Sequence, residues 1–301
     1  MSLLAGRIIN GLLLFFNIAV NVFYAFCLIF PPQTGQRKLP LTTLLGFLIL
    51  CSLLYCVPFV IQGIYDILFN EYAFILSYLI EYTVDYSMVS YVWLNFYYYI
   101  QIVPAQSAFF HWVKRNIKST IYVLLGIDIL ITLLSRITVN IFYAIIRSSP
   151  SSPFNTTVWQ DLKQSHMISF YMIMVHYAVM LCVSVVSSLS TVCYLHKHIK
   201  NMGKMGTSTT RLRGQMRVTI TGIFQGVLFF FYAVFLLLGN FSVEKLQFNI
   251  DIHIKYTLTS FFIFVTTVTL GIGQNVFRQK ILDMYKAFKH VSIWQRKEMA
   301  S

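Results

Sequence analysis

Four ionisable residues lie within stretches of the chain that are otherwise apolar: Glu81, Asp85, Asp128 and Arg136. An ionisable side chain inside a membrane-spanning segment is costly, and it either pairs with another charge or serves a function. Glu81 and Asp85 are four residues apart, which places both carboxylates on one face of a helix. Two roles suit these residues: an ion pair between helices, or an anionic anchor for a cationic ligand.

The depth of these residues in their apolar stretches favours the ion pair. Asp85 and Arg136 lie about eight and ten residues from the ends that neighbouring spans would share, which corresponds to about 12–15 Å of depth. We therefore expect Arg136 to pair with Asp85 or Glu81. The alternative, in which Asp85 binds a cationic ligand, stays open.

Further candidates for a ligand site lie on the same or neighbouring helix faces. Val89 and Trp93 continue the spacing of four from Asp85, and aromatic faces bind apolar and cationic molecules. Helix packing explains Trp93 equally well, because 17% of the residues are aromatic. His176 either lines the same cavity or bonds to a neighbouring carbonyl.

The sequence carries no recognisable catalytic set. Its seven histidines are scattered, with no cluster at the spacing of metal ligands inside an apolar stretch. No glycine-rich phosphate loop or serine nucleophile motif is present. We expect no enzymatic activity, no metal and no other cofactor.

The composition indicates a membrane protein. Of 301 residues, 57% are hydrophobic and 11% are charged, whereas about a quarter of the residues in a soluble domain are charged. A net charge of +13 would suggest nucleic acid as the partner of a soluble protein. Here the basic residues separate apolar blocks, so membrane lipid is the expected partner and nucleic acid is not.

Seven apolar stretches are long enough to cross a bilayer as helices, which needs about 20 residues each. They are continuous and not alternating, which favours helices over barrel strands. We predict an all-α membrane protein with a single domain over residues 1–301, a bundle of seven transmembrane helices. The predicted spans cover residues 7–30, 41–65, 77–103, 119–146, 167–195, 218–239 and 255–275.

An amphipathic C-terminal helix over residues 276–290 is expected to follow the last span. Its apolar residues fall on one stripe and its basic residues fill most of the remaining surface, which is typical of a helix lying on an anionic leaflet. The stripe consists of Phe277, Ile281, Met284, Tyr285 and Phe288.

The distribution of charge predicts the orientation. Of the 23 Lys and Arg residues, 17 fall in alternate connections and the C-terminal segment, which makes that side cytoplasmic. The N-terminus is then extracellular, the C-terminus is cytoplasmic, and we expect the plasma membrane as the location. Two glycosylation sequons, at Asn155 and Asn240, fall in predicted outer connections.

All five cysteines, an odd number, lie inside apolar stretches. Packing is the simplest role for such residues. We therefore predict no structural disulfide.

Seven helices with an outer N-terminus and basic inner connections describe a G-protein-coupled receptor, yet the rhodopsin-like motifs are absent. Short motifs instead resemble the type 2 (bitter) taste receptors. The run Tyr97 to Val103 is similar to the family's end of helix three, and Phe110, Trp112, Lys114 and Lys118 fall in register with its following inner loop. Further matches are Asn21, Asn155, Leu195, His198, Met202 and the stretch Phe229 to Phe235.

Three departures accompany this resemblance. Ser52 and Gln101 stand where the family has an arginine and a lysine. The family's His-Ser pair in helix seven is absent. We infer that the chain is a divergent member whose activation contacts differ from those of the family.

The resemblance implies a small-molecule agonist bound near the outer ends of helices three, five, six and seven, with contacts to Val89, Trp93 and Phe235. It also implies a heterotrimeric G protein of the gustducin type at the inner ends. The inner face would then include Tyr98, Gln101, Lys114, His198 and Lys200. The alternatives are a pheromone receptor of the type 1 vomeronasal family and, more remotely, a membrane transporter.

Overall fold

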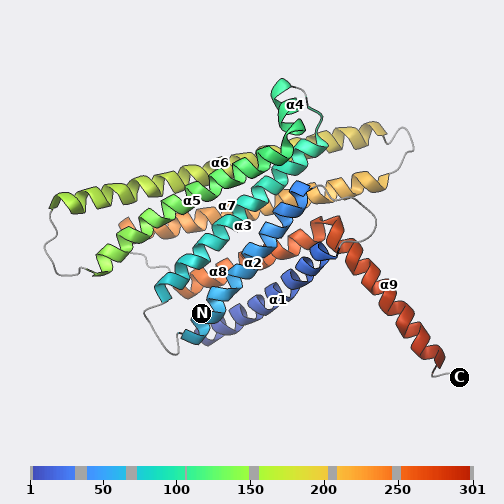
Figure 1. The fold of residues 1–301 in the computed structure, drawn as a ribbon, viewed down its shortest axis with the longest axis horizontal. Helices are drawn as coiled ribbons and strands as arrows, with labels where there is room; N and C mark the ends of the chain where they lie inside the picture. The colour runs from blue at the N-terminus through green and yellow to red at the C-terminus, as the bar shows by residue number, and fades with distance from the viewer. Residues whose placement is uncertain are drawn as a thin grey trace.

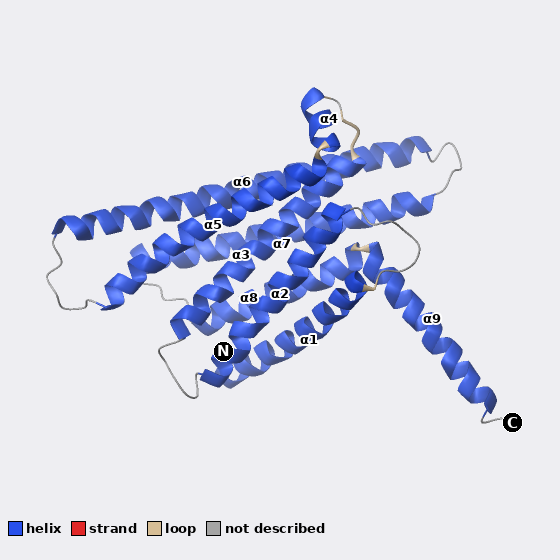
Figure 2. Ribbon diagram, viewed as in Figure 1, coloured by secondary structure: helices blue, strands red, loops and turns tan. Residues whose placement is uncertain are grey.

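A computed structural model describes residues 3–30, 39–65, 73–105, 107–148, 156–202, 209–245 and 252–298. These residues form nine α-helices and no strand (Figures 1 and 2). The helices are α1 (Leu3–Ile29), α2 (Leu39–Tyr65), α3 (Ala73–Ile102), α4 (Ala108–Arg115), α5 (Ile117–Ser148), α6 (Thr156–Met202), α7 (Thr209–Lys245), α8 (Ile252–Gly273) and α9 (Asn275–Glu298).

The long helices α1 to α3 and α5 to α8 run lengthwise side by side, whereas α4 and α9 project from one end (Figure 1). The two termini of the chain lie toward opposite ends of the molecule. The all-helical prediction is thus confirmed. Each predicted span coincides with one of these helices.

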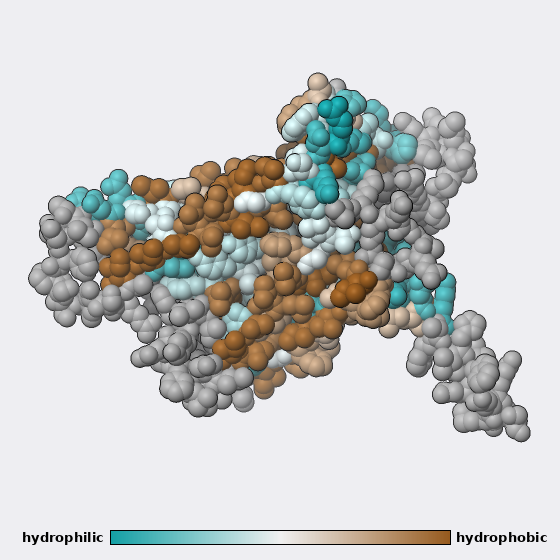
Figure 3. All heavy atoms as spheres, in the orientation of Figure 1, coloured by the Kyte–Doolittle hydropathy of each residue, from teal (hydrophilic) through white to brown (hydrophobic). Residues whose placement is uncertain are grey.

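Six of the described helices are long and apolar enough to cross a membrane: α1, α2, α5, α6, α7 and α8. Their outward side chains are large and apolar, for example Phe15 on α1, Leu130 on α5 and Phe231 on α7, all exposed. Brown, hydrophobic side chains accordingly cover much of the flanks of the bundle in Figure 3. Lipid is the solvent that such flanks require.

The helix α3 differs because it lies inside the bundle and contacts α2, α5, α6 and α7. Every residue from Ser87 to Asn95 is buried. A helix that faces other helices has no need of apolar side chains around its whole surface. This position explains why α3 is too polar to count as a span by hydropathy, so the predicted number of seven spans is not confirmed.

Two helices continue well beyond their predicted ends. The 47 residues of α6 span about 70 Å, against about 30 Å for the hydrocarbon core of a bilayer. Backbone hydrogen bonding propagates a helix past the point at which its side chains become polar. The helix therefore continues past the predicted end of its span at residue 195, and Lys197, His198 and Lys200 lie within α6.

The helix α7 likewise runs from Thr209 to Lys245, past the predicted end of its span at residue 239, so Asn240 is helical. The sequon at Asn155 lies outside the described residues.

The first helix, α1, packs tightly against α8. The Tyr24 ring occupies the space that a side chain at Gly271 would need, and it stacks on Phe277 with ring centroids 4.1 Å apart. The Oγ1 of Thr267 donates to Oδ1 of Asn17 at 2.7 Å, and Nδ2 of Asn21 donates to Oγ1 of Thr267 at 3.2 Å. Ring stacking, hydrogen bonds and the absent side chain of glycine together fix this contact.

The helix α9 begins one residue before its predicted start and extends to Glu298, eight residues past the predicted end. Phe277 is buried against α1, whereas Ile281, Met284 and Tyr285 of the predicted apolar stripe are exposed. Exposed apolar residues beside Lys280 and Lys286 suit a helix at a membrane surface.

All five cysteines are described, and none of them forms a disulfide within the described part of the chain.

Candidate functional site

A cluster of charged side chains from three helices, completed by a tyrosine from a fourth, lies near the end of the bundle opposite α4. Arg136 of α5 donates from Nε to Oδ2 of Asp85 at 2.8 Å and from Nη1 to Oε2 of Glu81 at 2.9 Å. Its Nη2 lies 2.7 Å from Oδ2 of Asp85. The predicted pairing of Arg136 with the acids of α3 is confirmed.

Tyr177 of α6 completes the surroundings of Asp85. Its hydroxyl donates to Oδ1 of Asp85 at 2.6 Å and accepts from Nη2 of Arg136 at 3.1 Å. Both oxygens of Asp85 are therefore engaged, and the residue is buried. Paired and hydrogen-bonded charges of this kind are the form in which a carboxylate is tolerated inside a membrane.

Lys255 in the first turn of α8 adds the fourth charge. Its Nζ donates to Oε1 of Glu81 at 2.5 Å. The two side chains are 35% and 27% exposed, respectively, so this pair forms the accessible edge of the cluster. With Arg136 and Lys255 opposite Glu81 and Asp85, the cluster is electrically neutral.

Two spaces adjoin this cluster. The first, among the charged side chains themselves, has a volume of about 10 Å³ and is bounded also by Tyr177, Tyr232 and Leu236. The second has a volume of about 110 Å³, and its walls include Glu81, Lys255, Tyr232, Tyr256 and Thr259. The larger space can hold a ring-sized group, whereas sites for whole drug-sized molecules reach roughly 300–1,000 Å³.

A second buried acid, Asp128 of α5, has different partners. It accepts a hydrogen bond from Nε1 of Trp93 on α3, and its Oδ1 lies 3.8 Å from Nδ1 of His176 on α6. Nε2 of His176 is buried without a hydrogen-bond partner among the described residues. A carboxylate, an indole and an imidazole from three helices thus meet in the core.

The residues proposed for ligand binding fall in four places. Asp85 borders the smaller space of the charged cluster, and Trp93 and His176 surround Asp128. Val89 is buried in the core. Phe235 of α7 is half-buried beside Tyr232, with ring centroids 6.4 Å apart. Of these five residues, only Asp85 borders either of the two spaces described above.

Sequence reasoning missed Lys255, Tyr177 and Tyr232. Lys255 is the first residue of the predicted span 255–275 and was given no partner, although a lysine directly before an apolar run is a signal for a paired charge. Tyr177 and Tyr232 carried no signal, because 19 tyrosines occur in the chain.

The residues predicted for the inner face belong to α3, α4 and α6, near the end where α4 projects (Figure 1). The hydroxyl of Tyr98 donates to Oε1 of Gln274 at 2.5 Å, which links α3 to the junction of α8 and α9. His198 stacks on Tyr194, Lys200 is exposed, and Gln101 and Lys114 are half-buried.

The described residues contain no group of three or more His, Cys, Asp or Glu side chains placed to hold a metal ion.

Comparison with known proteins identifies the family. The profile of the family described as taste receptor protein (TAS2R) matches residues 36–289, which is most of the chain. No curated protein matches this chain. The family match gives no support to the pheromone receptor or transporter alternatives, and the chain belongs to the TAS2R family of G-protein-coupled taste receptors.

Proposed function

We propose that this protein is a bitter taste receptor with seven spans, an extracellular N-terminus and a gustducin-type G protein at the α4 end. Membership of the taste receptor family supports the coupling. The 30 residues of α3 span about 45 Å, which exceeds the thickness of the bilayer core, and support its role as the seventh span. The basic residues near α4 support the orientation.

The agonist, in this proposal, reaches the receptor at the accessible edge of the charged cluster. This proposal is carried by a difference within the cluster: the oxygens of both acids are hydrogen-bonded, whereas one of the two cations keeps N–H donors that can bind a ligand. Asp85 and Glu81 each have both oxygens occupied. Lys255, with three N–H donors, contacts only the acid Glu81 among the described residues.

An agonist with an anionic group therefore fits this edge better than a cationic one. A carboxylate or sulfonate can accept a hydrogen bond from Lys255 while Arg136 keeps its partners. Tyr232, Tyr256 and Ile80 supply the aromatic and aliphatic walls for the body of the molecule. Val89, Trp93, His176 and Phe235 remain proposed as deeper elements of the ligand site.

Binding energy at this edge can favour a different arrangement of α3 and α8, because Glu81 and Lys255 belong to these two helices. A ligand shifts a receptor only by the difference in its affinity for the two arrangements. At the inner end, Tyr98 of α3 is hydrogen-bonded to Gln274, the residue between α8 and α9. This continuity supports a route from the agonist to the proposed inner face of Tyr98, Gln101, Lys114, His198 and Lys200.

Calcium release in cells that co-express a promiscuous G protein tests this function. Aromatic carboxylates and aromatic amines of matched size are compared on the wild type, on Lys255→Gln, and on Lys163→Gln as the control. Lys163 is an exposed lysine near the start of α6. We expect carboxylates to activate the receptor, and Lys255→Gln to lower their potency by roughly 10–100-fold, the loss of one charged hydrogen bond.

Two outcomes contradict separate parts of the proposal. Silence across a broad panel of bitter compounds, with the receptor confirmed at the surface, contradicts the bitter receptor function. Activation by amines alone, with Lys255→Gln unchanged, contradicts the anionic class and leaves the receptor function standing.

A further inference from the structure

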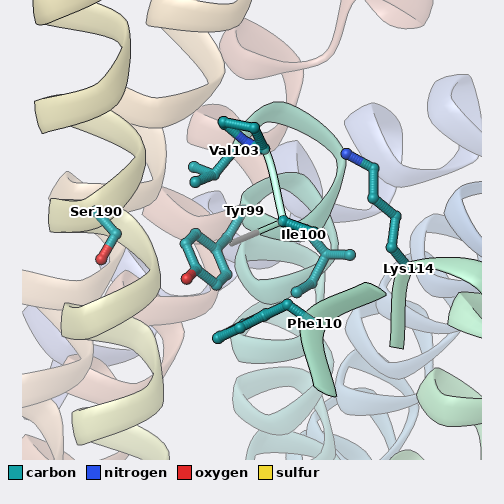
Figure 4. A pocket seen from close by; sticks show the side chains of 8 residues that line it. Tyr99, Ile100, Val103, Phe110, Lys114 and Ser190 are labelled. Atoms are coloured by element: carbon teal, nitrogen blue, oxygen red, sulfur yellow. The ribbon is translucent and has the colours of Figure 1, made fainter. Parts of the chain in front are cut away.

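A separate cavity of about 230 Å³ lies at the other end of the bundle, between α3, α4 and α6. Figure 4 shows its side chains converging from these three helices. They include Tyr99 and Ile100 of α3, Val103 directly after α3, Phe110 and Lys114 of α4, and Ser190 of α6. The cavity is remote from the charged cluster and shares no residue with the spaces beside it.

The cavity combines apolar walls with one cation. Tyr99 and Phe110 meet edge to face, with ring centroids 5.8 Å apart. Lys114 is the only charged residue among those that line it. The ion pairs within the described part of the chain involve only Arg136, Lys255 and His176 as cations, so Lys114 has no acidic partner there.

The surroundings of the cavity place it at the border between hydrocarbon and lipid head groups. On α6, Val186 is 60% exposed one turn before Ser190, and Leu189 is 53% exposed beside it. On α4, Phe109 is 67% exposed and Trp112 is 53% exposed. Aliphatic side chains on a span face the acyl chains, whereas aromatic side chains gather at the membrane interface.

The helix α4 also gives this border a positive charge. Ser107 caps its N-terminus by accepting from the backbone N–H of Phe110, and its last turn carries Lys114 and Arg115. Hydrophilic side chains accordingly gather around α4 in Figure 3. A basic pocket between helices on the cytoplasmic side is a known form of binding site for anionic head groups.

We propose that this cavity binds an anionic phospholipid of the membrane. An acyl chain lies against Tyr99, Val103 and Phe110, and the phosphate accepts hydrogen bonds from Lys114. The bound lipid joins α4 to α3 and α6 at the end where a G protein would dock. The cytoplasmic position of this site rests on the orientation given in the proposed function, whereas the binding itself does not depend on the agonist.

Native mass spectrometry of the purified full-length receptor tests this site. Dioleoyl phosphatidylglycerol and dioleoyl phosphatidylcholine, which share acyl chains and differ in charge, are titrated separately. We expect the wild type to prefer phosphatidylglycerol, and Lys114→Gln to lower that preference about fivefold, the contribution of one lysine near the surface. Lys114→Arg retains the charge and should retain the preference.

Two further variants separate the cavity from general surface attraction. Lys118→Gln removes an exposed lysine that does not line the cavity, and should leave the lipid preference unchanged. Ser190→Leu fills the space from α6, and should weaken the binding of both lipids. Lys114→Gln and Lys114→Arg keep the test valid if Ser190→Leu does not fold.

Three outcomes overturn the proposal. Equal losses in Lys114→Gln and Lys118→Gln would show diffuse attraction to the surface. Binding of oleate in place of phospholipid, lost in Lys114→Gln, would assign the cavity to a free fatty acid. Unchanged lipid affinity in Lys114→Gln with reduced G-protein activation would assign Lys114 to the G-protein contact alone.

Discussion

The two buried acids Asp85 and Asp128 meet contrasting surroundings in the same bundle. Asp85 has a guanidinium and a phenol hydroxyl as partners, and both of its oxygens are engaged. Asp128 accepts from the indole of Trp93, and the nearest basic group is the imidazole of His176, at 3.8 Å. Among the described residues, Asp85 is balanced by a permanent cation and Asp128 is not.

This contrast teaches that depth in a membrane does not by itself assign a role to an acid. Both residues are equally conspicuous as charges within apolar stretches. The partners separate them: Asp85 holds three helices together, whereas Asp128 adjoins a histidine whose second nitrogen is unpaired within the described structure. Variants at the partners of each acid measure how different the two sites are.

Replacing Arg136 by alanine should have the largest effect. The change leaves Asp85 buried without a cation, and breaking a buried pair in this way costs about 3–5 kcal/mol. We expect a severe loss of folded receptor, measured as surface expression and as the thermal unfolding of purified protein. Adding Asp85→Asn should restore part of the yield, because the amide carries no charge to be balanced. A double variant worse than Arg136→Ala would contradict the pairing.

Replacing Trp93 by phenylalanine should have an intermediate effect. The ring remains, but Asp128 loses its hydrogen-bond donor, which costs about 1–3 kcal/mol. In an Asp128→Asn background the same change should cost less, and a double-mutant cycle on thermal unfolding measures the difference. Agonist potency on surface-expressed Trp93→Phe supplies a second readout. A potency loss with unchanged stability would place Trp93 in contact with the ligand.

Replacing Lys255 by glutamine should change stability least. Glu81 keeps its bond to Arg136, and ion pairs between partly exposed side chains contribute about 0–1 kcal/mol. We expect a small shift in thermal unfolding beside the marked loss of agonist potency described above. A stability loss as large as that of Arg136→Ala would mean that the edge of the cluster is as structural as its centre.

The sequence predicted the ion pair because its partners are far from the ends of their spans. An error of a few residues in the predicted boundary of a span does not change which charged residues lie at the same depth, so Arg136 and Asp85 could be matched. Lys255 lies at the start of a helix, where an error of the same size in the boundary decides whether the residue is placed in a loop or in the helix. Because Lys255 stands at this boundary of the last predicted span, its bond to Glu81 was not predicted.

The lengths of the helices were harder to predict than their existence. Hydropathy detects where side chains meet lipid, whereas a helix ends where its backbone hydrogen bonds end. For α1, α2 and α5 the two limits lie within a few residues. For α6 and α7 they differ by several turns in total, so Asn240 and Lys200 lie in helices. Spatial neighbours such as Trp93 and His176 require the packed fold.

The contact of Tyr24 with Gly271 and Phe277 bears on how the receptor changes shape. Any residue larger than glycine at position 271 would push the first and last spans apart, so the two cannot slide past each other while this interlock holds. They should travel as a single rigid body, with α9 attached. A change in the arrangement of α3 and α8 on agonist binding would then move α1, α8 and α9 together relative to α3.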